Sequence, residues 1–400
     1  MRILFLTDKD CIPQNGGIER VVATLSEGFS KNNIDCYLLC SEKILGQDPK
    51  PFKRKYQLEK DNVLGQLETI VKENGINVLF SHYMSKYNRR IVLPRIPSLK
   101  EVVPNIKHVA LYHSQPGVEL KTFPLSVYMR RIFEGIQIKE NFAYMVKQML
   151  LRLVGKRIFK RFITPKCRLL YDYSDILVVL NEAYIQSYAS LVDVSCKERF
   201  RAIGNPLPYD VLDPEIEKKC KTFLVVSRME EETKRLSKVL RYWEQVQSVD
   251  ETWNLDIVGD GMDKKVYESM AKEMRLRRVT FWGQQLPRSF YEKSSIFLMT
   301  SDTEGWPMAL LETMQFGCVP IVFNSFASAS TIVSHSIDGI LVPPSDDVSY
   351  VNSMIRLMSD DSMRNRMAYA AVRDCQKFSV EKIVKKWIEL FNDLEIEKNA

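Results

Sequence analysis

The sequence lacks the features that would assign the protein to a membrane or to an oxidising compartment. Its 400 residues contain no run of 18 consecutive apolar positions, which excludes a helix that spans a bilayer. The opening residues "MRILFLTDKD" reach Asp8 and Lys9 too soon for the apolar core of a signal peptide, and they predict a buried first strand. We therefore expect a cytoplasmic protein that is either dissolved or bound peripherally at the inner face of the cell membrane.

Disulfide and metal chemistry are also poorly represented. The eight cysteines are scattered and form no Cys-x-x-Cys pair, so neither a disulfide scaffold nor a zinc site is indicated. There are four histidines, and no Asp-x-Asp motif stands in a suitable loop, which leaves no convincing set of metal ligands. We predict reduced thiols, no metal and no cofactor.

Positive charge is concentrated in one segment. Residues 127–168 contain eleven Lys or Arg against two Glu, a net charge of +9, whereas the whole chain carries +7. Apolar residues such as Phe142, Met149 and Leu153 recur near helical spacing, which predicts one or two basic amphipathic helices. Two interpretations stay open: the segment binds an anionic membrane, or its apolar side packs on its own domain. Nucleic acid is disfavoured, because no binding motif or aromatic platform accompanies the charge.

The hydrophobic pattern predicts an α/β chain of two domains. Amphipathic stretches alternate with the apolar runs "RILFLT", "IDCYLLC", "INVLFSHY", "IKHVALYHS" and "SDILVVLNEA", which is typical of parallel βαβ units. The turn-rich "AIGNPLPYD" predicts a linker, after which a second series begins with "KTFLVVSRM". We place a first domain at 1–206, a second at 207–376 and a C-terminal helix at 377–400, whose apolar stripe must be buried.

The stretch "SDTEGWPMALLETMQFGCVPIV", residues 301–322, combines two acids with the start of a helix. Pro307 suits the first helical turn, and free amides from Trp306 to Ala309 can bind phosphate there. Glu304 lies in the loop, whereas Glu312, in the second turn, can accept two hydrogen bonds from a diol such as a ribose. The alternative is that both acids are solvated surface groups.

A pair of cations follows the first strand of the second domain. The stretch "VVSRMEEETKRL" contains Ser227, Arg228 and Lys234, and its two cations can neutralise a leaving diphosphate when no metal is present. They can also pair with residues 230–232, as surface cations commonly do. Gly259 in "IVGDG" and Gly283 in "FWG" would bring further backbone close to a nucleotide.

These motifs together resemble a known family over nearly the whole chain. The combination of "GGIERVV", "GNPLP", "VSRM", "IVGDG", "EGWPMALLE" and "GCVPIV" is similar to the family 4 retaining glycosyltransferases of GT-B fold. The spacing of Glu304 and Glu312 in this order and context is a specific signal. The resemblance implies two Rossmann-like α/β domains that face each other across a cleft. The first would lie on the acceptor side, the second would bind a nucleotide sugar, and the C-terminal helix would cross back onto the first.

The resemblance also implies roles for single residues. Glu304 would contact the donor sugar, Glu312 the ribose, and Arg228 and Lys234 the diphosphate. Further donor contacts would come from Ser227, Gly259, Gly283, Gly16, Gly17 and the backbone of Gly305, Trp306, Pro307 and Met308. The sequence departs from the family pattern in one place, because "VSRM" replaces Val-Gly-Arg-Leu and the lysine follows the arginine by six residues instead of five. Arg235 is therefore an alternative to Lys234.

Two histidines end neighbouring predicted strands. His113 in "VALYHSQPG" matches the position where the family often has a histidine near the reacting face of the donor sugar, so we predict a catalytic role for it. His82 ends the preceding strand. The alternative for either residue is a structural hydrogen bond, which is common for a histidine at a strand end.

The resemblance implies a retaining, metal-independent glycosyltransferase of hexosyltransferase type. It would move a sugar from a nucleotide diphosphate sugar, with a UDP-sugar favoured, to a hydroxyl of a glycan or lipid-linked acceptor in cell-surface polysaccharide, lipopolysaccharide or glycolipid synthesis. Two other classes stay open. A nucleotide-sugar epimerase would need no acceptor, and a non-catalytic sugar-nucleotide binding protein would not need Glu304, Glu312 and Arg228 together.

Overall fold

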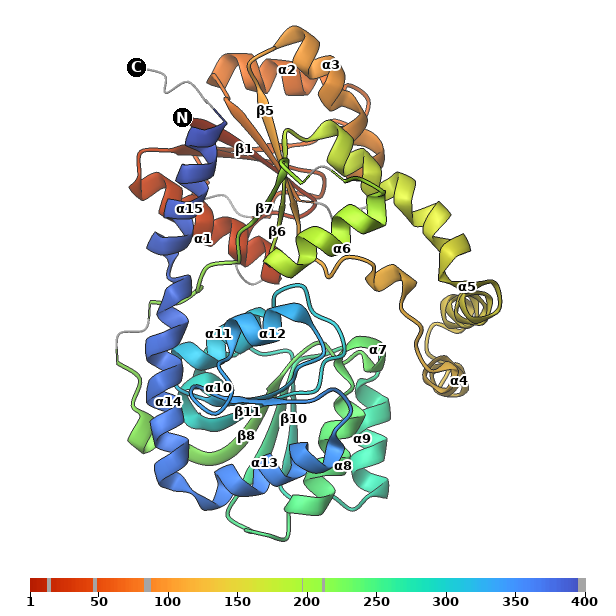
Figure 1. Ribbon diagram of the computed structural model, residues 1–400, viewed down its shortest axis with the longest axis vertical. Coiled ribbons are helices and arrows are strands. Elements are labelled where there is room, and N and C mark those ends of the chain that lie inside the picture. The colour runs from red at the N-terminus through yellow and green to blue at the C-terminus, as the bar shows by residue number, and fades with distance from the viewer. Residues whose placement is uncertain (13–15, 46–48, 83–87, 196, 211–212, 395–400) are drawn as a thin grey trace. The chain divides into compact units, whose positions relative to one another are not determined.

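The computed structural model describes residues 1–12, 16–45, 49–82, 88–195, 197–210 and 213–394, and it divides into two compact units (Figure 1). Unit 1 comprises residues 1–117, 160–208 and 378–400, and unit 2 comprises residues 118–159 and 209–377. Each unit contains its own parallel sheet with helices. The predicted α/β class with two Rossmann-like sheets is therefore confirmed.

Unit 1 is built on a parallel sheet of seven strands in its described residues, in the order β3-β2-β1-β4-β5-β6-β7. The first strand lies inside the sheet, where Ile3 is opposite Cys36 on one side and Val78 on the other. Its run is apolar because both faces are covered, as in other doubly wound sheets. The strands are β1 (Arg2–Thr7), β2 (Asp35–Cys40), β3 (Arg54–Gln57), β4 (Val78–His82), β5 (Lys107–Tyr112), β6 (Ile176–Val179) and β7 (Phe200–Ala202).

The C-terminal helix of unit 1 packs against the first helix, as the sequence predicts (Figure 1). The side chains of Phe29 and Phe391 meet with ring centroids 5.7 Å apart, and Trp387 packs on Phe80 at 4.8 Å. Gly28 permits this approach, because a Cβ at this position would lie 2.5 Å from Val384 Cγ2. The helices wholly within unit 1 are α1 (Gly17–Lys31), α2 (Val63–Asn74), α3 (Ile96–Val102), α6 (Glu182–Val192) and α15 (Val380–Asp393).

Unit 2 contains a parallel sheet of six strands in its described residues, in the order β10-β9-β8-β11-β12-β13. Phe223 of the central strand is opposite Leu255 on one side and Ile296 on the other, and all three side chains are fully buried. The strands are β8 (Cys220–Val226), β9 (Asn254–Val258), β10 (Val279–Gly283), β11 (Ser294–Met299), β12 (Val319–Phe323) and β13 (Ile340–Val342).

The helices of unit 2 that connect these strands follow the same alternation. The sequence predicts helices over "SKVLRYWEQV", "KKVYESMAKEMR" and "PMALLETMQFG", and the structure has α8, α9 and α11 there. The helices are α7 (Glu231–Lys234), α8 (Leu236–Val246), α9 (Lys264–Glu273), α10 (Arg288–Lys293), α11 (Met308–Gln315), α12 (Ala327–Ile332), α13 (Asp347–Ser359) and α14 (Asp361–Cys375).

The connection between β5 and β6 carries two further helices, α4 (Leu125–Phe133) and α5 (Ile138–Tyr173). The backbone of Gly155 interrupts α5 with φ 78° and ψ 158°, a conformation that favours glycine. Residues 118–159 belong to unit 2, whereas the sequence predicts that 127–168 lie wholly in the first domain. The physical reason is a set of polar contacts from Lys121 and Arg131 to unit 2, which sequence spacing does not reveal. None of the helices in the described ranges combines the length and the apolar composition that crossing a bilayer requires.

Candidate functional site

Both sheets change their winding direction between two neighbouring strands. In unit 2 the chain proceeds from β8 to β9 and β10 on one side, and from β11 to β12 and β13 on the other. Open parallel sheets bind ligands at the carboxyl ends of the strands that flank such a switch. The loops that follow β8 and β11 contain Arg228, Lys234, Glu304 and the start of α11, so the predicted residues of unit 2 meet at one edge of its sheet.

The central relationship of this site is an ion pair between two predicted residues. Lys234 Nζ lies 2.6 Å from Glu304 Oε1, and their side chains are only 15% and 12% exposed. Arg235 stands beside them and donates from Nη2 to Asp302 Oδ2 at 2.7 Å. The two loops therefore carry paired charges in a poorly solvated place, where an anion could compete for the cations.

Backbone hydrogen bonds join the same two loops. Asp302 N donates to Thr233 O at 2.8 Å, and Thr300 Oγ1 lies 2.9 Å from Lys234 O and 3.0 Å from Arg235 O. Arg235 itself has φ 51°, a left-handed conformation that separates α7 from α8. The position of Lys234 is thus tied to the loop that carries Glu304.

Arg228 is placed differently from Lys234. Its side chain is 73% exposed, and Nη1 lies 3.1 Å from Glu230 Oε1. The surface pairing that the sequence leaves open is therefore present for Arg228, whereas Lys234 pairs across to Glu304. Exposed pairs of this kind contribute little to stability, so the Arg228 side chain can be redirected at small cost.

Gly259 and Gly283 lie next to the loop that contains Ser227. Gly259 N donates to Gly283 O at 2.8 Å, and Ser227 N donates to Val258 O at 3.0 Å. A Cβ on Gly259 would lie 1.9 Å from Ser227 O, and its φ of 133° also disfavours other residues. This position requires glycine because two backbones approach closely.

Glu312 is buried and hydrogen-bonded. It is 2% exposed, and Tyr291 donates its hydroxyl to Glu312 Oε2 at 2.6 Å. The sequence gives no signal for Tyr291, since the partner lies 21 residues earlier on α10. One carboxylate oxygen is therefore already held within unit 2, which constrains how this acid can meet a diol.

The start of α11 differs slightly from the prediction. Pro307 is the N-cap and not the first helical residue, and Leu310 N donates to Pro307 O at 3.1 Å. Trp306 is buried, with 7% of its surface exposed, and it precedes the helix together with Gly305. Met308 opens the helix, so the amides of the first turn lie at the end of α11 that favours anions.

The predicted residues of unit 1 lie at its own sheet edge. Gly17 begins α1, and Gly16 precedes it with extended backbone, φ 160° and ψ 179°. His113 follows β5, and its Nε2 lies 2.5 Å from Nδ1 of His82, the last residue of β4. Burial lowers the pKa of His113 to about 3, and burial together with His113 holds the pKa of His82 well below its usual value. Both rings are therefore neutral near pH 7.

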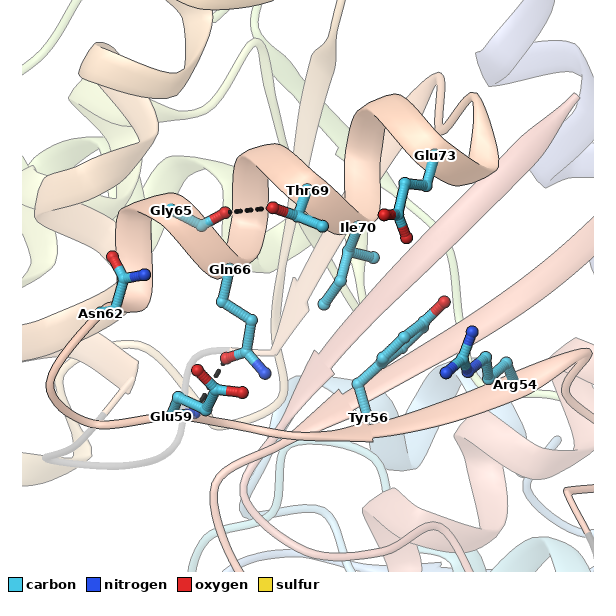
Figure 2. A pocket seen from close by; sticks show the side chains of 9 residues that line it. All are labelled: Arg54, Tyr56, Glu59, Asn62, Gly65, Gln66, Thr69, Ile70 and Glu73. Atoms are coloured by element: carbon cyan, nitrogen blue, oxygen red, sulfur yellow. Dashed lines mark hydrogen bonds between the residues drawn. The ribbon is translucent and has the colours of Figure 1, made fainter.

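A separate hollow lies in unit 1, between β3 and α2, with a volume of about 290 Å³ (Figure 2). Tyr56 and Arg54 come from the strand, and Gln66 and Thr69 project from the helix on the opposite side. Gln66 Oε1 accepts from Glu59 N at 2.8 Å, so the wall is already hydrogen-bonded. None of the predicted site residues lines this hollow.

The fold and the site define a protein of two parallel α/β sheets whose second unit presents basic and acidic side chains at its switch point. Residues 213–374 match the model of the family described as Glycosyl transferases group 1, and this part of the chain belongs to that family. The predicted family is thereby confirmed for residues 213–374.

Similar proteins include two named as glycosyltransferases and one named as a phosphotransferase. An α-1,4-N-acetyl-D-galactosaminyltransferase of Campylobacter jejuni, named for a diphosphoundecaprenol-linked glycan as its acceptor, is 20% identical over 83% of this chain and 93% of its own length. An exopolysaccharide phosphotransferase of Streptomyces coelicolor is 30% identical over 36% of this chain, and an uncharacterized glycosyltransferase of Haemophilus influenzae is 28% identical over 37%. These matches span only 15% and 43% of the length of those two relatives.

Solved structures share the fold over both units. The lipopolysaccharide outer core galactosyltransferase WaaB, in its apo form, superposes with a TM-score of 0.65 and 16% identity over 98% of this chain and 100% of its own. The Anabaena protein HepE in complex with UDP has a TM-score of 0.69 and 14% identity over 98% and 100% of the two chains. This likeness agrees with the predicted GT-B fold class.

Proposed function

We propose that the protein is a retaining glycosyltransferase that uses a nucleotide diphosphate sugar, with a UDP-sugar favoured. The observation that carries the proposal is the Lys234–Glu304 pair at the switch point of unit 2, where a diphosphate and a sugar would meet a cation and an acid. The family of residues 213–374 and the UDP bound in the HepE structure support the choice of donor.

The reaction needs charge stabilisation where the diphosphate leaves. The bond between the anomeric carbon and the β-phosphate oxygen breaks, and its electron pair goes to the phosphate. Lys234 and Arg228 would neutralise the charge that develops on this oxygen, with the first-turn amides of α11 beside them. Glu304 forms an ion pair with Lys234. A bound diphosphate would replace Glu304 as the partner of the lysine, and Glu304 would then contact the sugar.

Retention can follow from two successive inversions on a carboxylate nucleophile or from attack on one face. In the second route, which the family resemblance implies, the acceptor hydroxyl attacks from the face that the phosphate leaves. The new bond joins the hydroxyl oxygen to the anomeric carbon, and the hydroxyl proton goes to the departing phosphate. His113 would lie on the sugar side as a neutral hydrogen-bonding ring. Its pKa of about 3 means that the ring does not take up a second proton at neutral pH. No step uses a metal, so transfer should persist when a chelator is added. Loss in chelator and recovery with a divalent ion would contradict this.

The acceptor is a hydroxyl of a glycan, and a lipid-linked one is favoured. The Campylobacter relative, which matches most of this chain, acts on a diphosphoundecaprenol-linked glycan. Such an acceptor lies at a membrane, so the enzyme would work in the cytoplasm at the inner face of the cell membrane. Synthesis of a cell-surface polysaccharide, lipopolysaccharide or glycolipid is the corresponding process.

The exposed apolar side of α4 and α5 supports a membrane surface over 127–168. Phe133 is 85% exposed, Leu153 79% and Phe162 66%, whereas the polar side chains of Asn141 and Gln148 are buried. Large apolar side chains are thus exposed where a helix on a protein surface usually carries polar ones, and exposed Lys and Arg accompany them. This combination fits an anionic bilayer interface, where each cation adds about 1 kcal/mol of binding energy.

Vesicle sedimentation tests that surface. We expect the protein to sediment with vesicles that contain phosphatidylglycerol and to remain in solution with phosphatidylcholine alone. Phe133→Ser combined with Leu153→Ser should abolish sedimentation, whereas the control, Leu286→Ser combined with Val348→Ser, changes two other exposed apolar residues and should not. Equal sedimentation of the wild type with both kinds of vesicle would remove the membrane from the proposal.

The transfer itself is tested with a panel of UDP-, GDP- and ADP-sugars, incubated with the protein and a membrane extract. Release of nucleoside diphosphate from one donor, together with label in the lipid fraction, is expected, and both should disappear in Glu304→Ala. Conversion of the donor without any acceptor would favour an epimerase. Tight nucleotide binding without turnover would favour a non-catalytic binding protein.

A further inference from the structure

One buried arginine outside the predicted site makes an extensive set of contacts within unit 2. Arg131 of α4 is 1% exposed, and its guanidinium forms a two-pronged contact with Asp263, with Nε 2.7 Å from Oδ1 and Nη2 2.5 Å from Oδ2. Its remaining nitrogen, Nη1, lies 2.7 Å from Glu232 Oε1 and 3.3 Å from Asn141 Oδ1. Burial alone would lower the pKa of Arg131, but the hydrogen bonds and charges of Asp263 and Glu232 outweigh it and raise the pKa.

The partners of Arg131 hold the start of α7. Asp263 Oδ2 also accepts a hydrogen bond from Glu231 N at 2.7 Å, and Asp263 N donates to Met229 O at 3.1 Å. Glu231 begins α7, and Glu232 is its second residue. The guanidinium and the first amide of α7 therefore share one carboxylate oxygen, so Arg131 and the helix start are bound as one unit.

The other end of α7 is Lys234, the predicted diphosphate ligand. The helix is a single turn of four residues, and Lys234 N donates to Glu230 O at 2.9 Å. One turn has no stability of its own, because helix nucleation is unfavourable. Its place depends on the contacts at its two ends, and a shift of Glu231 moves Lys234 with it.

The segment that carries Arg131 also contacts the second loop of the site. Lys121 Nζ donates to Asp302 O at 2.7 Å and lies 3.4 Å from Asp302 Oδ2, and Asp302 pairs with Arg235. Residues 118–159 thus hold both loops that bear Lys234 and Glu304. Through these contacts they belong to the donor site and not only to a surface.

Stability alone gives little reason for an arginine here. Transfer of a guanidinium and two carboxylates out of water is costly, and well-packed apolar side chains often serve as well or better. What a buried arginine fork adds is a fixed direction, because its donors define the positions of several acceptors at once. The contacts of Arg131 therefore indicate that it sets the positions of Asp263 and Glu232.

We propose that Arg131 is a positioning residue for the transfer reaction, which fixes α7 through Asp263 and Glu232 and thereby places Lys234 for the donor diphosphate. The inference rests on the proposed function, since it assigns the diphosphate to Lys234. Arg131 itself does not touch the substrate.

A double-mutant cycle tests this, with the affinity for UDP measured by calorimetry. Arg131→Met should weaken UDP binding about ten-fold, within the range of coupling that residues of one network show. In the Lys234→Ala background the same substitution should weaken binding less than about two-fold, because the group that it places is gone. Arg130→Met removes the neighbouring, partly exposed arginine and should leave the affinity unchanged.

A second measurement does not depend on nucleotide. Amide hydrogen exchange at residues 231–234 should become faster in Arg131→Met, and Arg131→Lys, which keeps the charge without the fork, should restore it only in part. If Arg131→Met does not fold, Arg131→Lys takes its place in both measurements, with the same direction expected.

The outcomes separate the two proposals. Unchanged UDP affinity in the folded Arg131 variants, or an equal loss with and without Lys234, would overturn the positioning role. If the wild-type protein binds none of UDP, GDP and ADP, the proposed function fails, and exchange at 231–234 then decides whether Arg131 fixes α7. Unchanged exchange would overturn it.

Discussion

Lys234 Nζ and Glu304 Oε1 lie 2.6 Å apart, although the two residues are separated by 70 positions in the sequence. Each was predicted to serve the donor separately, and in the structure each is the ion-pair partner of the other. Glu304 thus neutralises Lys234, and a diphosphate that binds as proposed would replace one anion by another. Substitutions of the two residues should therefore have opposite effects on nucleotide affinity.

Lys234→Ala should weaken UDP binding about ten-fold or more, the usual worth of a hydrogen bond to a charged group. Glu304→Gln keeps the shape but removes the competing charge, so UDP should bind as well as in the wild type or better, while sugar transfer is lost. Titration calorimetry with UDP measures both, and Lys265→Ala, an exposed lysine on α9, is the control. A loss of UDP affinity in Glu304→Gln would contradict this account of the pair.

Tyr291→Phe should destabilise unit 2 through the buried carboxylate of Glu312. The substitution removes the 2.6 Å hydrogen bond from a site that is closed to water, and we expect a loss of about 1–3 kcal/mol in the free energy of unfolding. Urea unfolding followed by tryptophan fluorescence measures it. Tyr369→Phe is the matched control, because its hydroxyl bonds Glu217 at an exposed site and its loss should cost less than about 1 kcal/mol. Equal effects of the two substitutions would show that the buried hydrogen bond contributes no more to the free energy of unfolding than the exposed one.

Gly28→Ala tests the contact between α1 and α15. Alanine usually stabilises a helix relative to glycine by about 1 kcal/mol. Here the new Cβ would lie 2.5 Å from Val384 Cγ2 and 2.8 Å from Val380 Cγ1, so we expect a net loss of about 1–3 kcal/mol. The control is Gly65→Ala in α2, where the Cβ meets only the side chain of Asn62, which can move away. Thermal unfolding of both variants decides the matter, and a stabilised Gly28→Ala protein would show that the two helices do not pack tightly.

Three histidines with lowered pKa values should make unit 1 sensitive to acid. Burial lowers the pKa of His113 to about 3 and that of His108 to about 4, and the pKa of His82 is also lowered. Unfolded chains take up protons on these rings below about pH 6.5, whereas the folded protein does not. Stability is therefore complete above about pH 6.5 and falls as the pH drops toward 4.

The expected loss is about 1.4 kcal/mol per pH unit for each histidine that stays neutral in the fold. Denaturant unfolding at intervals from pH 4.5 to 7.5 measures this slope. His108→Gln should reduce it by about one proton, because neutral His108 donates from Nδ1 to Tyr173 O and accepts at Nε2 from Ser81. A slope that is the same in the wild type and in His108→Gln would contradict the assignment.

The sequence predicts the sheets well, because buried parallel strands are continuous apolar runs. β1 and β11 are found where "RILFLT" and "SIFLMTS" stand, and the apolar stripe of the tail predicts both α15 and its burial. It misses β3, whose residues "RKYQ" are polar and which pairs only at the edge of the sheet. Such a strand is held by hydrogen bonds to the backbone of its neighbour, which amino-acid composition does not reveal.

Local motifs predict where the candidate residues stand in the chain but not how they pair. Lys234 follows β8 and Glu304 follows β11, as their motifs indicate. The contact of Arg131 with Asp263 spans 132 positions, and no spacing rule connects them. The same limit hides the burial of Glu312 against Tyr291. Partners across a fold depend on packing, whereas motifs report only what is near in the chain.

The discontinuous make-up of unit 1 has a consequence for synthesis on the ribosome. The chain emerges from its N-terminal end, so the strands of the first sheet are complete long before α15 is made. Trp387 and Phe391 of α15 cover Phe80 and Phe29 in the folded protein. Until residues 380–393 are synthesised, these two phenylalanines lack that cover. The first unit to be started is thus the last to be finished. A nascent chain on a ribosome that stalls after β13 exposes this apolar surface, to which chaperones can bind.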